Sequence, residues 1–182
     1  VVFRVLNPIE MKELLKVLAV NEKRVRDAII GVGISGDPSY VPWLIKQMEA
    51  PKLAKIAGEA FSVICGVDIA YEDLDGELPK DFHTGPTENP EDEDVDMDTD
   101  EDLPCPDPAL IDRWWKQHQQ NFNANARYLL GNPVTQPHCQ EVLKSGKQRQ
   151  RQAAALELAL MQVQQPLFET RAPGKRQQQW LS

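Results

Sequence analysis

The chain has 182 residues, with 20 Lys and Arg against 28 Asp and Glu, and therefore carries a formal net charge of −8. Its 41% of hydrophobic and 26% of charged residues are typical of a globular protein and exclude the collagen-like, wholly disordered and disulfide-scaffold classes. No apolar run approaches the ~20 residues of a membrane-spanning helix, so no membrane partner is expected. Three scattered cysteines and no charged-then-apolar leader favour a reducing compartment, and we expect a cytoplasmic protein without a signal peptide.

Residues 1–71 are predicted to form short amphipathic helices. The first begins at Asn7-Pro8-Ile9-Glu10, which combines a capping box with a proline in the first turn. The second spans about 22–34 and ends at Gly36-Asp37-Pro38, a turn that also caps the third helix. The fourth covers 53–65. No stretch alternates with a period of two, so no strands are predicted.

The acidic residues are concentrated after these helices. Between Glu72 and Asp107 there are 16 acidic residues and one basic residue, so this segment carries −15 and the remainder of the chain +7. Its charge, its prolines and its few large apolar side chains predict a disordered linker over about 75–106. The chain is therefore divided into N-terminal repeats at 1–71, an acidic proline-rich insert at 72–106, and a helical C-terminal part at 107–182.

The C-terminal part is also predicted to be helical. Asp107-Pro108 caps a helix whose apolar stripe includes Trp114 and Trp115. Two further helices are expected at 135–145 and 148–165, and a short one near 173–181. Because both tryptophans lie within the stripe, we interpret them as core residues; the alternative is that one of them anchors an interface.

The chain also resembles itself at fixed offsets. An offset of 30 places Asn7-Pro8 on Asp37-Pro38, and an offset of 125 places it on Asn132-Pro133. The offset of 125 also places Arg24 and Arg26 on Arg149 and Arg151. A period near 30 built from helix–turn–helix units is typical of an α-solenoid. We therefore predict an all-α solenoid of helical hairpins, interrupted by the acidic insert.

The motif Gly36-Asp37-Pro38, followed by Val41-Pro42 and Leu44-Ile45, resembles the short HEAT-like repeats of phycobilisome lyases. The resemblance covers about 22–66 and 132–165, but not the region of Trp114-Trp115. The order of features over the whole chain is similar to an uncharacterised bacterial family of HEAT-like proteins associated loosely with type VI secretion loci. The resemblance implies a HEAT-like fold and supplies no catalytic residues.

No catalytic, cofactor-binding or metal site is predicted. The run from Gly31 to Gly36 fits G-x-G-x-x-G, but a helix precedes it, whereas a dinucleotide site needs a strand there. The acidic run 91–102 lacks the glycine and glutamate positions of an EF-hand, and the His and Cys residues have no zinc spacing. We expect a non-enzymatic protein without a cofactor or a specific metal ion.

The candidate partner-binding residues are basic or aromatic and lie in the C-terminal part: Trp114, Trp115, Lys147, Arg149 and Arg151. Residues 108–182 hold ten basic residues against four acidic ones. For the paired arginines we favour a structural role, in which they bond a capping residue or a carbonyl of a neighbouring helix; a basic stripe for a partner is the functional alternative.

These observations predict an adaptor or scaffold for a protein partner, which the resemblance places near a type VI secretion system. Nucleic-acid binding or DNA-base repair, as in HEAT-like DNA glycosylases, is the alternative. A charge of +7 without a dense Lys/Arg cluster argues against it, so nucleic acid is not the expected partner.

Overall fold

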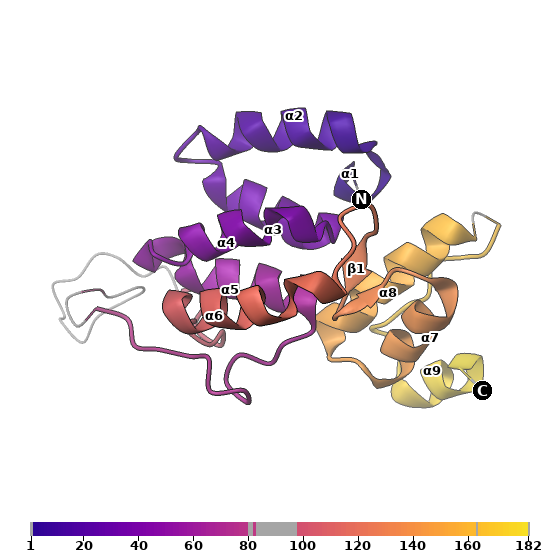
Figure 1. Cartoon of the computed structure of the whole chain (residues 1–182). Coiled ribbons are helices and arrows are strands. Elements are labelled where there is room, and N and C mark those ends of the chain that lie inside the picture. The colour runs from indigo at the N-terminus through magenta and orange to yellow at the C-terminus, as the bar shows by residue number, and fades with distance from the viewer. Residues whose placement is uncertain (1, 80–81, 83–97, 163, 182) are drawn as a thin grey trace, which may run out of the picture.

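The computed structural model describes residues 2–79, 82, 98–162 and 164–181. This part of the chain is mostly helical, as predicted, with one pair of two-residue strands (Figure 1). The elements are α1 (Val2–Val5), α2 (Pro8–Ala19), α3 (Val25–Ser35), η1 (Pro38–Tyr40), α4 (Val41–Gln47), α5 (Pro51–Cys65), α6 (Pro108–His118), η2 (Gln119–Asn121), β1 (Tyr128–Leu129), β2 (Asn132–Pro133), α7 (Gln136–Ser145), α8 (Gln148–Met161) and α9 (Gly174–Leu181).

The predicted helix caps are confirmed. The Asn7 side chain accepts hydrogen bonds from the backbone N–H groups of Ile9 and Glu10, and the Glu10 carboxylate accepts one from the Asn7 N–H in return. Asp37 and Asp107 each accept backbone N–H groups two residues on, at the starts of η1 and α6. These side chains satisfy donors that a helix start leaves unpaired, which is why the helices begin at these residues.

The larger core is formed by the N-terminal helices together with α6. Helix α3 packs against α2 and α5, and α4 packs against α5 and α6. Ile29, Leu44 and Phe61 are fully buried there. Helix α6 follows the acidic insert, yet its Ile111 and Trp115 belong to this core. A smaller core joins α7, α8 and β1, and Figure 1 shows α7 and α8 on the side of β1 away from α4 and α5.

The prediction of no strands is wrong at one place. Tyr128–Leu129 pairs antiparallel with Asn132–Pro133 across a turn in which Leu130 and Gly131 have φ of 51° and 79°. Positive φ at both central residues is typical of a tight hairpin turn. Strands of two residues are too short to show an alternating pattern, so the sequence carried no signal for them.

The hairpin also satisfies the C-terminal ends of two helices. The Tyr128 N–H donates to the Gly36 carbonyl at 2.7 Å, and the Leu130 N–H donates to the Val63 carbonyl at 2.7 Å. The Gly131 N–H donates to Ile64 at 2.9 Å. Helix C-termini have carbonyls without helical partners, so the hairpin stabilises α3 and α5 by supplying the missing donors.

The prediction of a disordered linker is wrong for its C-terminal end. Asp100 is only 7% exposed and forms a bidentate ion pair with Arg26 of α3. The Arg26 Nη2 lies 2.7 Å from the Asp100 Oδ1. Asp98 lies 3.2 Å from the Lys55 Nζ of α5. The oppositely charged side chains of Arg26 on α3 and Lys55 on α5 stabilise these carboxylates in the folded protein. Residues 80–81 and 83–97 of the predicted linker lie outside the described residues.

Candidate partner-binding groove

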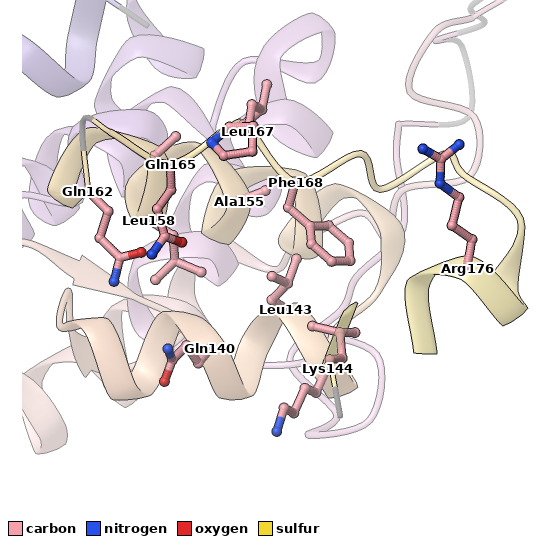
Figure 2. A pocket seen from close by; sticks show the side chains of 13 residues that line it. Gln140, Leu143, Lys144, Ala155, Leu158, Gln162, Gln165, Leu167, Phe168 and Arg176 are labelled. Atoms are coloured by element: carbon pink, nitrogen blue, oxygen red, sulfur yellow. The ribbon is translucent and has the colours of Figure 1, made fainter. Parts of the chain in front are cut away.

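A groove of about 740 Å³ lies between α7, α8, α9 and residues 162 and 165–168 (Figure 2). Its α8 side is formed by Ala155, Leu158, Ala159 and Gln162. These residues have the spacing i, i+3, i+4 and i+7, which places them on one face of the helix. Glu157 lies on the opposite face and is buried in the body of the protein, as is Ala154 on the flank between the two faces. Helix α8 therefore has one face buried in the body of the protein and another, mostly apolar face that lines the groove.

The other walls of the groove continue this apolar surface. Leu143 of α7 lies at its base, and Phe168 lies beside it in Figure 2. Leu167 contributes a side chain that is 56% exposed, which is a large value for a leucine next to other apolar groups. Surface apolar groups gathered in a concave site mark a binding surface more often than isolated ones do.

The charges on the groove have one sign. Lys144 of α7 and Arg176 of α9 are the charged side chains among the described residues that line it, and no carboxylate lies among them. Three glutamine amides, Gln140, Gln162 and Gln165, complete the polar part of the lining. The groove therefore combines an apolar floor with a cationic, hydrogen-bonding rim.

Helix α9 is held in place by a polar cluster. The Gln177 side chain is buried; its Nε2 donates to the Thr170 carbonyl at 3.0 Å, and its Oε1 accepts from Arg151. Arg151 also donates from Nε to the Leu143 carbonyl at 2.8 Å, and Gln148 donates to Thr170. These bonds fix the wall that α9 supplies. Arg151 therefore has the structural role considered for the paired arginines, because it bonds a carbonyl of the neighbouring helix α7.

The other predicted basic residues lie away from this groove. Lys147 pairs with Asp68 at 3.1 Å, and this hydrogen bond lowers the pKa of the Asp68 carboxyl. Arg149 is exposed and lines a second hollow of about 500 Å³ together with Lys147. Carboxylates of Asp68 and two other acidic residues line the same hollow, Glu59 and Asp102. Its mixed charges give it less selectivity for a charged ligand than the groove has.

The two tryptophans lie in different environments. Trp115 is 7% exposed and its ring contacts Phe122, with centroids 5.3 Å apart, so it is a core residue. Trp114 is half-buried: its ring meets Phe61 edge-on at 5.5 Å and stacks on His118 at 4.2 Å. The core interpretation therefore holds for Trp115, while Trp114 keeps part of its surface accessible.

A buried ionic cluster joins the two cores, and the sequence analysis missed it. Glu157 of α8 is 4% exposed and accepts hydrogen bonds from Arg4 at 2.8 Å and from Arg127 at 2.6 Å. Arg127 also donates to the Ser35 carbonyl at 2.8 Å. The cluster therefore ties α1, α3, the hairpin strand region and α8 together. A single glutamate in a glutamine-rich helix gave no local signal for partners so distant in sequence.

The glycine-rich run and the cysteines have structural roles. Gly31 and Gly33 lie inside α3, where a side chain on Gly33 would come within 3.1 Å of Ala60 on α5. These glycines therefore allow α3 to pack closely against α5. The run lies within a helix, whereas a dinucleotide site would need it between a strand and a helix. Burial raises the pKa of the Cys139 thiol to about 11 and also raises that of Cys65, so both are protonated at neutral pH.

Across the described residues, no group of three or more His, Cys, Asp and Glu side chains is placed to hold a metal ion. None of the helices in the described ranges is long and apolar enough to cross a membrane. No protein-family model, curated protein or solved structure matches the chain.

Proposed function

We propose that the protein is a non-enzymatic adaptor that binds a protein partner through the groove between α7, α8 and α9. The observation that carries this proposal is the apolar lining of the groove, in which Leu158 and Ala159 of α8 are only partly buried and Leu167 is 56% exposed. Burying such a face on a partner is favourable by about 25 cal/mol for each Å² of apolar surface removed from water. A partner that supplies the missing surface would therefore bind here.

We further propose that the fold is a HEAT-like solenoid. The pairs α2–α3, α4–α5 and α7–α8 each pack as neighbouring helices, and α3 also packs on α5. In a solenoid each hairpin buries one face on its neighbour and offers the other to the next unit. The α7–α8 hairpin fits this scheme, because Glu157 faces the body while Leu158 faces the groove.

The resemblance to HEAT-like proteins supports a cytoplasmic location and, more specifically, a partner within a type VI secretion apparatus or its cargo. This partner identity rests on the resemblance alone. The groove supports a protein partner independently of that pathway.

Protein is favoured over nucleic acid by the way the basic residues are used. Arg26, Lys55 and Lys147 pair with carboxylates, and Arg127 and Arg151 donate to backbone carbonyls or buried side chains. Nucleic-acid binding requires several cations that remain available to contact phosphates. The pairing of these residues within the protein leaves fewer cations for that purpose.

The proposal is tested by capturing partners from the native cell with the tagged full-length chain and identifying them by mass spectrometry. Leu158→Gln places a polar amide on the groove floor, and Leu160→Gln is the matched control, because Leu160 is 37% exposed on α8 and does not line the groove. We expect a partner protein that the wild type and Leu160→Gln capture and Leu158→Gln loses. Capture of nucleic acid alone, released by salt, would overturn the proposal.

A further inference from the structure

We infer that basic side chains of α3 and α5 form a second binding site, which the chain's own residues 98–102 occupy, and that an acidic peptide of a partner protein binds there by displacing them. The site consists of Arg26, Lys52 and Lys55, and residues 98–102 form the acidic arm that covers it. This surface is separate from the groove between α7, α8 and α9, so the inference holds whether or not the groove binds a partner.

The acidic arm is bound as a ligand would be. Both Nη atoms of Arg26 donate to the Asp100 carboxylate, at 2.5 and 2.7 Å, and Nη2 also donates to the Thr99 hydroxyl oxygen at 3.2 Å. The Lys55 Nζ lies 3.2 Å from the Asp98 carboxylate. A bidentate bond between arginine and a carboxylate adds geometric specificity to the attraction. Only about 10 Å³ remains empty between the arm and its surroundings, so the arm fits the site closely.

A local turn presents the two carboxylates of the arm together. The Asp100 N–H donates to the Asp98 side chain at 2.9 Å, and the Leu103 N–H donates to the Asp100 carbonyl at 2.9 Å. Bonds of this kind, from an aspartate to the backbone two residues on, form within a few residues of any chain. A peptide of another protein with the pattern Asp-x-Asp can therefore adopt the same turn. The arm thus specifies the chemistry of the partner.

The arm contributes no apolar contact to the fold. Residues 98–102 include no apolar side chain, and three of the five are exposed. The insert is closed at its base instead, where backbone hydrogen bonds of 2.8 and 2.9 Å join 74–76 to 105–107. The Arg26 side chain stays 38% exposed, and ion pairs with an exposed member are screened by salt. Carboxylates of another chain can therefore replace those of the arm without the loss of a core contact.

An apolar hollow beside the site gives a partner a contact that the arm lacks. It measures about 580 Å³, and its apolar lining includes Ala19, Val25, Ala50 and Leu53. Lys52 lines both this hollow and the arm's site, which places the two side by side. A peptide with a large apolar side chain near its Asp-x-Asp pair fills both, and such anchors supply much of the energy of an interface. This extra contact offsets the effective concentration of the tethered arm, which is on the order of millimolar.

Nucleic acid is a poorer occupant of this site than an acidic peptide. The occupant seen in the structure is a peptide turn, and the site offers three cations. Nucleic acid gains its affinity from a longer row of cations that contact successive phosphates. A duplex DNA is nevertheless included in the experiment, because its phosphates share the negative charge of the arm.

The experiment titrates the full-length chain against fluorescein-labelled peptides and follows fluorescence anisotropy. The acidic probe has about 12 residues and contains Asp-Thr-Asp-Glu-Asp and one phenylalanine. The neutral probe has asparagine and glutamine in place of its aspartates and glutamate. Asp98→Asn combined with Asp100→Asn removes the competing carboxylates from the arm. We expect this double variant to bind the acidic probe on the order of tenfold more tightly than the wild type does, and to bind the neutral probe no more tightly.

Controls separate the site from a general effect of charge. Glu13→Gln combined with Glu141→Gln removes two exposed carboxylates of α2 and α7, so it changes the net charge equally and should leave the affinity at the wild-type value. Adding Arg26→Gln to the double variant should weaken binding of the acidic probe on the order of tenfold. Arg113→Gln, at an exposed arginine of α6, should not weaken it.

The wild-type chain supplies a test that does not depend on the folding of any variant. We expect a saturating amount of the unlabelled acidic probe to move the NMR amide resonances of 99–103 towards disordered values, because the arm leaves the site. Resonances of 74–76 and 105–107 should move little, since the base of the insert stays closed. Circular dichroism verifies that the variants keep their helices.

Four results would overturn the inference. The first is equal binding of the acidic probe by the double variant and by the charge-matched control, and the second is undiminished binding after Arg26→Gln. The third is binding of the acidic probe to the wild type without movement of the arm resonances. The fourth is tighter binding of duplex DNA than of the acidic probe by the double variant, which would make nucleic acid the ligand. The outcome with Leu158→Gln bears on the groove alone.

Discussion

Glu157→Gln removes the negative charge from the buried ionic cluster while keeping the size of the side chain. In the native protein the Glu157 side chain is 5% exposed and lies 2.8 Å from the Arg4 Nε and 2.6 Å from the Arg127 Nη2. Loss of the Glu157 charge destabilises Arg4 more than Arg127, because the Arg4 side chain is only 7% exposed and burial already lowers the pKa of its guanidinium. The variant therefore leaves a buried cation without its counter-charge.

The expected loss of stability follows from these exposures. Breaking a buried ion pair by removing one partner costs about 3–5 kcal/mol. Arg127 limits the cost, since its side chain is 36% exposed and it keeps its bond to the Ser35 carbonyl. We therefore expect Glu157→Gln to lower the free energy of unfolding by about 3 kcal/mol, the lower end of that range.

The assay is urea unfolding at pH 7 followed by far-UV circular dichroism, which gives the free energy of unfolding by linear extrapolation. Glu141→Gln, at an exposed acid of α7, is the control and should remain within about 0.5 kcal/mol of the wild type. Adding Arg4→Met to Glu157→Gln should restore about 1–2 kcal/mol, because the unpaired cation is removed. A Glu157→Gln protein as stable as Glu141→Gln would refute the reasoning.

Three further predictions use the cores, one turn and the thiols. Leu44→Ala should lower the free energy of unfolding by about 2–5 kcal/mol in the same assay, since Leu44 is fully buried, and a neutral result would contradict its place in the core. Gly36→Ala should cost more than about 1 kcal/mol, because φ is 69° and a side chain would overlap the carbonyl oxygen of Tyr128; unchanged stability would show that the hairpin does not close on α3. At pH 8 an alkylating reagent should modify half-buried Cys105 first and the buried Cys65 and Cys139 only on unfolding, as mass spectrometry of peptides would show; early labelling of either buried thiol would be inconsistent with its burial.

The local parts of the fold could be predicted from the sequence. Asn7, Asp37 and Asp107 cap helices because their side-chain oxygens bond backbone N–H groups only two or three residues away. Gly36 ends α3 in a left-handed conformation for the same local reason. Signals of this kind are contained within one helical turn, so a single sequence reveals them.

The parts that the sequence analysis missed depend on distant residues. The segment around Asp100 has the composition of a solvated loop. Only the ion pair with Arg26, which is distant in sequence, makes burial of the Asp100 carboxylate favourable. The groove was missed for a related reason: the sequence places Ala155, Leu158 and Ala159 on one apolar face of a helix, and only the structure shows that Ala155 is buried while Leu158 and Ala159 stay partly exposed. Arg149 was predicted from its repeat spacing and Lys147 from the basic charge of the C-terminal part, whereas the position of Lys144 on the groove could be seen only in the structure.

The hairpin and the ionic cluster have a consequence for the rate of folding. Most contacts in a helical protein are local, and such proteins fold quickly because little chain entropy is lost before contacts form. Here the Arg127 Nε meets the Ser35 carbonyl across 92 residues, and Arg4 meets Glu157 across 153. These two closures require the whole chain to be brought together before Ser35 at the end of α3 and Glu157 within α8 gain their partners. Helix formation is then expected to be fast, with the long-range closure at Arg127 as the slow step.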